Sequence, residues 1–467
     1  MRTWHTLAAL SLLALPALAQ DLGERLARRA GALGPKVEWS LVVVDLASGE
    51  TLGAHQAERA LIPASNMKLL TTVAALELLG PDFVHETRVV LQGAPVEGRV
   101  PGHLWVVGGG DPTISRRFDP EPLLSDWAEA LWKKGVRRIG GDVVIDDRCF
   151  EAVRWHPAWE PEDRDEWYGA EVSGLTLNDG CVDVAVSGGD RAPRVELRPA
   201  SDYHRLDLQA RAGGAKKEHR YSILRAGEDE RTLRVTGVVW TKAGAAETSV
   251  PVPDPGLWFG FVLERALRER GITVEGRVRH AAPDEQAGGL TVHLRKAPLP
   301  RTLEVTNRRS QNLYAECLLK TLGRTQEREG SWTAGARVLE RWAREAGIAP
   351  EQVKVSDGSG LSRQNRLSAR ALGQVLRRVL LGKHAALFES SLAAPGEEGT
   401  LRSRLTKLPG GVKLRGKTGT MTGIHGLSGV LTRGERKVVF AFLGNGPGAV
   451  RAALDDMVEL VAAEMAR

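Results

Sequence analysis

The chain has 467 residues, of which 42% are hydrophobic and 26% are charged, and its formal net charge at pH 7 is +6. These fractions are those of an ordinary soluble protein, and the length excludes a single core of average size, so we expect two or three domains. The basic residues are scattered rather than clustered, which favours a solvated surface over a dedicated site for an anionic polymer.

The N-terminal residues 1–19 have the pattern of a secretory signal. Arg2 and His5 precede an apolar run over 7–15, and 17–19 supply small residues before a cleavage site after Ala19. The run is too short to span a bilayer, and no later segment approaches that length. We therefore expect secretion across the inner membrane to the periplasm or cell envelope, with at most peripheral envelope association. Nucleic acid is not an expected partner there.

The next elements in chain order change character at about residue 85. Residues 37–54 predict two strands around an Ala-Ser-Gly-Glu turn, and a helix follows from about Ser65. Over 85–285 there are short strand-like runs separated by Gly, Pro and Asp. Helical patterns interrupt them only near 122–135 and 258–270.

After residue 300 the chain is helical, then forms three closely spaced strands and a last helix over 448–466. Two strands at the start and three at the end can join in one five-stranded antiparallel sheet with helices on its faces, an α+β layer domain. We thus predict a signal peptide over 1–19, a discontinuous domain over 20–84 and 286–467, and an inserted β-rich region over 85–285 that is large enough for two small domains.

Three cysteines, Cys149, Cys181 and Cys317, leave one unpaired at best. In an oxidising compartment Cys149 and Cys181 could form a disulfide, which the sequence leaves open. Cys317 lies on an expected helix and fits a small core residue. No Cys or His pairs have metal-ligand spacing, so we expect neither a structural metal nor a cofactor.

The stretch Pro63-Ala64-Ser65-Asn66-Met67-Lys68 allows two interpretations. Ser65 can cap the helix that follows, since serine is a favoured N-cap residue. It can also be a nucleophile with Lys68 as its base, because the Ser-x-x-Lys spacing puts hydroxyl and amine one turn apart on one helical face. The spacing is common by chance and does not decide between them.

Two further motifs have equally plain alternatives. Ser310-Gln311-Asn312 lies at an expected loop-to-helix junction, where it could be another N-cap. Lys417-Thr418-Gly419-Thr420 lies on an expected strand, where it could be an ordinary sheet surface. Gly419 indicates a point where another group must approach the backbone closely.

Together the three motifs describe a serine acyl-transfer site. A serine hydroxyl is a weak nucleophile unless a base removes its proton, and a desolvated lysine can do so. A second Ser-Lys pair can relay the proton to a leaving amine, and an asparagine can hold a substrate amide. A cationic strand edge with two threonine hydroxyls can hold a carboxylate.

The motifs PASNMKLLTT, SQNLYAE and KTGTM, with the long gap between the first two, resemble those of DacB-type D-alanyl-D-alanine carboxypeptidases/endopeptidases. These are class C low-molecular-mass penicillin-binding proteins. The resemblance covers nearly the whole mature chain and implies a β-lactamase/transpeptidase-like domain with two inserted domains. Further similar stretches are GGGDPT (108–113), GDVVIDDRCF (141–150), WYGAEVSGLTLN (167–178), SDGSGLSRQNRLS (356–368) and GEEGTLRSR (396–404).

The resemblance assigns catalytic roles to five residues. Ser65 would be acylated, with Lys68 as its general base. Ser310 and Lys417 would pass the proton to the departing D-alanine, and Asn312 would orient the substrate amide. The substrates would be peptidoglycan stem peptides ending in D-Ala-D-Ala, and β-lactam antibiotics would acylate the same serine.

The resemblance also implies substrate-binding residues. Thr418 and Thr420, on either side of Gly419, would bind the terminal carboxylate. The backbone N–H groups of Ser65 and Thr420 would form the oxyanion hole.

A second carboxylate and an ammonium need partners if the stem peptide contains diaminopimelate. Arg363 and an aspartate of the inserted region, Asp146 or Asp147, would bind them. The alternative for these three is surface ion pairing.

Two other functions remain to be weighed against this one. A serine β-lactamase would need fast deacylation, yet no Glu-x-x-Leu-Asn-like segment lies between Asn312 and Lys417, and the second motif begins with serine rather than tyrosine. A non-catalytic cell-wall-binding protein would not need to retain all five catalytic residues.

Overall fold

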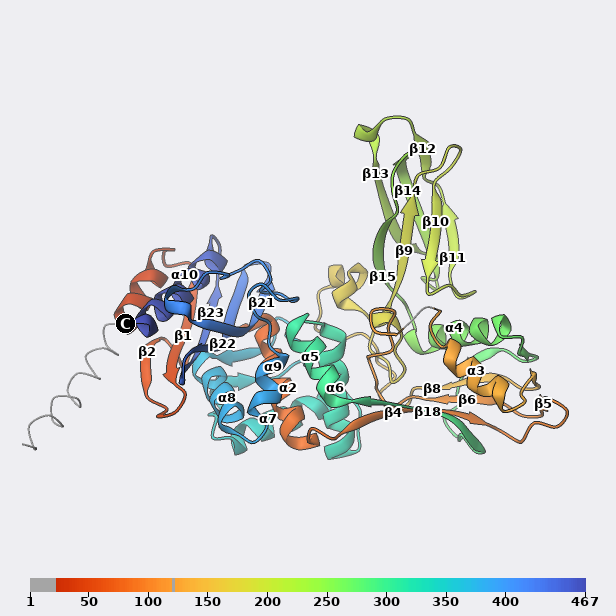
Figure 1. The fold of residues 1–467 in the computed structure, drawn as a ribbon, viewed down its shortest axis with the longest axis horizontal. Coiled ribbons are helices and arrows are strands. Elements are labelled where there is room, and N and C mark those ends of the chain that lie inside the picture. Colours follow the sequence, from red (N-terminus) through yellow and green to blue (C-terminus); the bar gives the residue numbers. More distant parts are fainter. Residues whose placement is uncertain (1–21, 120–121) are drawn as a thin grey trace, which may run out of the picture. The chain divides into compact units, whose positions relative to one another are not determined.

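The computed structural model describes residues 22–119 and 122–467, so the expected signal peptide lies outside the described residues. Contacts divide the chain into two compact units (Figure 1). The first contains Leu299–Arg467 and the chain up to Phe83, and the second contains Val84–Pro298. The second unit extends beyond the expected boundary at residue 285, because strand β18 (Leu290–Pro298) pairs with β4 (Val84–Leu91).

The first unit contains the five-stranded sheet that joins the two ends of the chain. Its order is β2-β1-β23-β22-β21, and every neighbouring pair is antiparallel, as predicted. Strand β21 is therefore an edge strand. The bounds are Thr51–His55 (β2), Glu38–Asp45 (β1), Arg436–Asn445 (β23), Ile424–Arg433 (β22) and Lys413–Met421 (β21).

Both faces of this sheet are covered by helices, which explains why β1 is almost continuously apolar. Successive side chains of a strand point to opposite faces. Leu41 and Val43 share a hydrophobic core with the helix over 22–31 and with α10 (Val450–Ala466). Val42 lies on the other face, against α8 (Ala369–Leu381), where a Cβ on Gly373 would lie 3.2 Å from Val42 Cγ1.

Helix α2 (Met67–Leu79) is the centre of the helical layer, and every residue from Met67 to Leu76 is buried. A helix that is buried all round must be packed on all sides. Its neighbours are α8 and three helices that follow the second unit in the chain, α5 (Leu299–Arg308), α6 (Asn312–Glu327) and α7 (Trp332–Glu345). A further helix, α9 (Ala385–Ser391), packs on α5 and α8 (Figure 1).

A small sheet ties two loops together beside α2. Its order is β19-β20-β3, with bounds Val353–Lys354, Arg366–Ser368 and Ala60–Leu61. Strand β3 immediately precedes the residues around Ser65, and β20 immediately follows the loop 355–365. The pairing therefore brings that loop to the start of α2.

The second unit is β-rich, with helices α3 (Ser125–Lys133) and α4 (Pro255–Glu269) at the two places predicted from the sequence. One mixed sheet has the order β17-β8-β6-β4-β18, and three smaller sheets surround it. A large hydrophobic core, including Val106 and Val235, runs through these sheets, and Val90, Trp105 and Val144 form a separate small cluster.

The other strands of the second unit are Arg99–Val100 (β5), Leu104–Val107 (β6), Arg138–Ile139 (β7), Val143–Asp146 (β8), Cys181–Ser187 (β9), Arg194–Arg198 (β10), Arg205–Leu208 (β11), Arg211–Gly213 (β12), Arg220–Ala226 (β13), Thr232–Trp240 (β14), Ala246–Pro251 (β15), Thr273–Val274 (β16) and Val278–His280 (β17).

All three cysteines are thiols, so the Cys149–Cys181 disulfide that the sequence left open is not formed. Cys317 is fully buried in α6, as expected for a core residue. Within residues 22–119 and 122–467, none of the helices has the length and apolar character needed to cross a membrane.

The core between the sheet and α10 gives a stability prediction. Phe442 is completely buried there, with its ring centroid 5.2 Å from that of Phe440. Phe442→Ala should lower the free energy of unfolding of this unit by about 3–5 kcal/mol, because it removes the ring and leaves a cavity. Urea denaturation followed by circular dichroism measures the loss. Leu381→Ala, at a side chain that is 53% exposed, is the control and should change little; equal losses in both variants would contradict this packing.

Candidate active site

Ser65 lies on a short 3₁₀ helix, η1 (Ala64–Asn66), which leads directly into α2. Its side chain does not cap either helix: the N-cap positions belong to Pro63 and Asn66, and neither helix has a side-chain capping bond. The half-buried Ser65 hydroxyl instead accepts a hydrogen bond from Lys68 Nζ at 2.9 Å. The capping interpretation of Ser65 is therefore wrong, and the Ser-x-x-Lys pair forms.

The Lys68 side chain is completely buried, and its Nζ has three oxygen acceptors. These are Ser65 Oγ at 2.9 Å, Asn312 Oδ1 at 2.6 Å and the carbonyl oxygen of Ser359 at 2.8 Å. An ammonium group has three N–H donors, so each donor has one acceptor. The acceptors come from η1, from the first residue of α6 and from the loop 355–365, which together fix the position of the amine.

The burial of Lys68 also changes its protonation. Loss of hydration lowers the pKa of Lys68 to about 7, although the negative charges of Glu316 and Asp357 act in the opposite direction. At neutral pH a substantial fraction of Lys68 is therefore the free amine. An amine in contact with a hydroxyl group can accept its proton, which makes the hydroxyl oxygen a nucleophile.

A second lysine-serine pair links β21 to the segment before α6. The buried Lys417 Nζ donates to Ser310 Oγ and to the Thr418 carbonyl oxygen, each at 2.7 Å. Ser310 has a left-handed backbone, with φ +61°, and the N-cap of α6 is Gln311, so Ser310 is not the predicted cap. Burial lowers the pKa of Lys417 well below its usual range, and the neighbouring charge of Lys68 lowers it further.

Strand β21 approaches η1 so closely that only glycine fits at one position. A Cβ on Gly419 would lie 2.7 Å from Asn66 Nδ2, 2.9 Å from the Pro63 carbonyl oxygen and 3.1 Å from Ser65 N. The predicted close approach at Gly419 is confirmed, and the approaching segment is the one that holds Ser65. Gly426 on β22 meets the same side chain, with a Cβ position 2.2 Å from Asn66 Nδ2.

Arg363 lies beside the far end of this strand. Its Nη2 donates to the carbonyl oxygen of Thr422, at 3.3 Å, in the turn that follows β21. On the strand itself Thr418 is buried, whereas Thr420 is exposed. The structure thus brings Arg363 to the strand on which the sequence analysis placed the substrate carboxylate.

Asp146 and Asp147 belong to the second unit, and their part in substrate binding stays a prediction. Asp146 ends β8 and pairs with Arg148, from Nε to Oδ1 at 2.8 Å and from Nη2 to Oδ2 at 2.9 Å. Asp147 is mostly buried, which by itself would raise its pKa. His280 and Arg154 outweigh that effect and lower the pKa to about 2. Each aspartate therefore already has a cation beside it.

Three residues of the site were given no role in the sequence analysis. Glu316 lies in the motif SQNLYAE, four positions after Asn312 and therefore on the same face of α6. Asp357 lies in the loop 355–365, where its carboxylate accepts from Gly360 N at 2.7 Å and Ser362 N at 2.6 Å. Asn66, the last residue of η1, is buried against β21 and β22 and had no sequence signal beyond its place in the motif.

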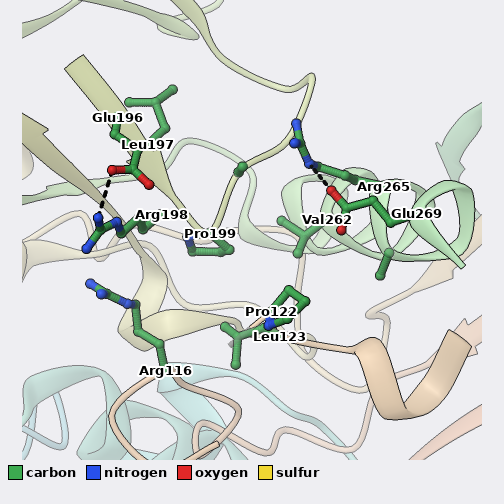
Figure 2. Close-up of a pocket in the computed structure, with 12 residues that line it drawn as sticks. Arg116, Pro122, Leu123, Glu196, Leu197, Arg198, Pro199, Val262, Arg265 and Glu269 are labelled. Atoms are coloured by element: carbon green, nitrogen blue, oxygen red, sulfur yellow. Dashed lines mark hydrogen bonds and ion pairs between the residues drawn. The ribbon is translucent and has the colours of Figure 1, made fainter. Parts of the chain in front are cut away.

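A cavity of about 400 Å³ is lined by residues of the second unit and contains none of the candidate catalytic residues (Figure 2). Four of its charged side chains pair with one another, Arg198 with Glu196 at 2.7 Å and Arg265 with Glu269 at 2.8 Å. The fifth, Arg116, pairs with Asp183 at 2.9 Å and Glu247 at 2.7 Å, which do not line the cavity. Among the described residues that line it there is no serine, cysteine, histidine or lysine. The serine-lysine pair needed for the predicted chemistry is therefore absent from these lining residues.

Known proteins are similar to this chain over almost its whole length. The D-Ala-D-Ala carboxypeptidase 3 (S13) family matches residues 18–464. A D-alanyl-D-alanine carboxypeptidase of Actinomadura sp. is 32% identical over 478 residues, covering 97% of this chain and 88% of the relative. The D-alanyl-D-alanine carboxypeptidase DacB of Haemophilus influenzae is 26% identical over 394 residues, covering 83% of this chain and 81% of the relative.

The fold is shared as well. The crystal structure of penicillin binding protein 4 from Haemophilus influenzae matches with a TM-score of 0.80 at 21% identity, over 95% of this chain and 99% of that chain. The same protein in complex with a β-lactam matches with a TM-score of 0.74 at 20% identity, over the same shares of the two chains. The predicted α+β fold is therefore confirmed.

Fold and family together define a serine peptidase of the penicillin-binding class. The chain belongs to the D-Ala-D-Ala carboxypeptidase 3 (S13) family, and the resemblance inferred from its motifs is confirmed.

The depressed pKa of Lys68 predicts a pH-dependent stability. The unfolded chain retains the ordinary pKa of 10.5, so between about pH 7 and 10.5 it binds more protons at Lys68 than the folded chain does. The free energy of unfolding should therefore rise with pH more steeply in the wild type than in Lys68→Met, by up to about 1.4 kcal/mol per pH unit. Urea denaturation at several pH values tests this; a difference between the two proteins that does not change with pH would contradict it.

Proposed function

We propose that this chain is a serine D-alanyl-D-alanine carboxypeptidase that hydrolyses peptidoglycan stem peptides through an acyl-enzyme on Ser65. The observation that carries the proposal is the contact of Ser65 Oγ with Lys68 Nζ at 2.9 Å, in which the lysine is fully buried and its pKa is about 7. Membership in a carboxypeptidase family supplies the substrate class.

Acylation starts when the Lys68 amine removes the Ser65 hydroxyl proton. Oγ then attacks the carbonyl carbon of the penultimate D-alanine, and the carbonyl oxygen becomes an oxyanion. The backbone N–H groups of Ser65 and Thr420 bind that oxyanion. This assignment is supported by the close approach of β21 to η1, since the Cβ position of Gly419 lies only 3.1 Å from Ser65 N.

Collapse of the tetrahedral intermediate breaks the C–N bond, and the departing D-alanine needs a proton on its nitrogen. The proton that Lys68 took from Ser65 reaches this nitrogen through Ser310 and Lys417, whose contact at 2.7 Å forms a second donor-acceptor pair, and Lys68 is left neutral. Water then attacks the Ser65 ester, with Lys68 again as base, and releases the shortened stem peptide.

The terminal part of the substrate binds along strand β21. Thr418 and Thr420 bind the terminal carboxylate next to the Lys417 charge. Asn312 directs its Oδ1 to Lys68, at 2.6 Å, and we assign its amide nitrogen to a substrate carbonyl group. Arg363 binds the side-chain carboxylate of diaminopimelate, and Asp146 or Asp147 accepts from its ammonium group.

The same chemistry extends to two further substrate classes and implies a location. A cross-link between stem peptides presents the same D-alanine carbonyl group, so the protein also acts as an endopeptidase. A β-lactam acylates Ser65 through its strained amide. Peptidoglycan as substrate, together with the predicted signal at residues 1–19, supports a location in the periplasm or cell envelope.

Covalent labelling with a fluorescent penicillin tests the nucleophile. The wild type should form one adduct of the expected mass, and a peptide map should place it on Ser65. Ser65→Ala should lose labelling completely, because alanine lacks the hydroxyl oxygen that the penicillin acylates. Equal labelling of the variant would overturn the mechanism. Release of the hydrolysed drug faster than hydrolysis of D-Ala-D-Ala peptides would identify a β-lactamase instead.

Gly419→Ala tests the close approach of β21 to η1. The added methyl group would collide with Asn66 and with the Pro63 carbonyl oxygen, so the strand must move away from Ser65. We expect the second-order rate constant of acylation by penicillin to fall by roughly 100-fold, as for a displaced catalytic group. Gly31→Ala is the control, because a Cβ there has no heavy atom within 4 Å. Unchanged acylation in Gly419→Ala would show that this spacing does not matter.

A further inference from the structure

Glu316, on α6, is completely buried, and its carboxylate accepts from three N–H donors of other segments. Oε1 accepts from Ser359 N at 2.8 Å, and Oε2 accepts from Gly358 N at 3.0 Å and from Trp332 Nε1 at 2.8 Å. A buried carboxylate is costly unless such donors surround it. Two of the three donors are consecutive backbone groups of the loop 355–365.

Those two backbone groups connect Glu316 to the catalytic amine. Ser359 makes both bonds: its backbone N–H donates to Glu316, and its carbonyl oxygen accepts from Lys68 Nζ at 2.8 Å. Thr71 Oγ1, one turn after Lys68 on α2, donates to the Gly358 carbonyl oxygen at 2.8 Å. The loop thus lies between a carboxylate on α6 and donors on α2, and its carbonyl groups face the donors.

The loop has no space in which to move away from this position. A Cβ on Gly358 would lie 2.6 Å from the Ala315 carbonyl oxygen, and one on Gly360 would lie 1.9 Å from the Ala64 carbonyl oxygen. The backbone therefore contacts α6 on one side and η1 on the other. A change in its hydrogen bonds to Glu316 would be transmitted to the Ser359 carbonyl group and to Lys68.

Three other charged groups lie close to Lys68 and Glu316. Asp357, on the loop, has its carboxylate occupied by Gly360 N and Ser362 N. Lys417, on β21, has its own pKa lowered well below the usual range by burial and by the charge of Lys68. Lys320, one turn after Glu316, has its Nζ 3.4 Å from the centroid of the Trp332 ring. The charge of Glu316 raises the pKa of Lys68 against the effect of burial. Burial and the charge of Asp357 raise the pKa of Glu316 itself to about 7.

We propose that Glu316 is a positioning residue for acylation: it holds the Ser359 carbonyl group against Lys68, and its charge sets the pH at which Lys68 becomes a base. The inference rests on the proposed function of Ser65 and Lys68. Glu316 does not touch the substrate or the reacting atoms, and it acts through the loop and through its charge.

The test is the pH profile of penicillin acylation in Glu316→Gln. Lys68 must be neutral to accept the Ser65 proton, and removal of the negative charge disfavours its protonated form. The acid limb of the profile should therefore move to lower pH by about one unit. The plateau rate constant should fall at least about tenfold, because a glutamine amide nitrogen cannot accept from the loop N–H that it would face. An acid limb that stays in place or moves to higher pH would overturn the proposal.

Two further variants separate charge from structure. Glu316→Asp keeps the charge but shortens the side chain, so it should restore the wild-type acid limb while the plateau remains low. This variant also tests the proposal if Glu316→Gln does not fold, because an unchanged plateau in Glu316→Asp would contradict it. Glu340→Gln is the matched control: Glu340 on α7 accepts from Val355 N of the same loop at 3.0 Å, and its change should leave the limb in place.

The result is distinguishable from a failure of the proposed function. If wild-type Ser65 takes no covalent label, the function is wrong whatever Glu316 does. If the wild type labels at Ser65 and the acid limb of Glu316→Gln coincides with that of the wild type, only the role of Glu316 is wrong.

Discussion

The burial of one lysine amine is the constraint on which the rest of the site depends. Lys68 has no exposed surface, so its Nζ must find all of its hydrogen bonds inside the protein. It finds them on η1, on α6 and on the loop 355–365, segments that are far apart in the sequence. The free energy cost of burial also makes the amine easy to deprotonate. The same packing that assembles the three segments therefore turns Lys68 into a base.

Close backbone contact gives this arrangement its precision. Gly419, Gly358 and Gly360 each lie where a side chain would collide with the backbone or side chain of a neighbouring segment. Such positions leave little room for adjustment, so β21, η1 and the loop have one mutual placement. The left-handed backbone of Ser310 adds to it by aiming that hydroxyl at Lys417. Catalytic geometry here results from backbone packing as much as from the choice of side chains.

The sequence by itself determined those features that depend on local patterns. Apolar strands at both ends of the chain were enough to predict the five-stranded antiparallel sheet, since each must bury both faces. The spacing of Ser65 and Lys68 allowed their contact, because one turn of helix separates them, and the other two motifs were needed to favour it over a helix cap. The three motifs in order were enough to identify the family. The glycine within the third motif correctly indicated a close approach, although not which segment approaches.

Only the tertiary structure decided which distant groups share a hydrogen bond. Ser65 and Ser310 had the local pattern of helix caps, yet both hydroxyls accept from lysines, because packing places an amine within reach of each. The role of Glu316 depends on a loop more than forty positions later, whose N–H groups no pattern in the sequence pairs with α6. The second unit ends at Pro298 because β18 pairs with β4 across the whole insertion. A local pattern is set by helix and strand geometry, whereas these contacts depend on how the entire chain packs.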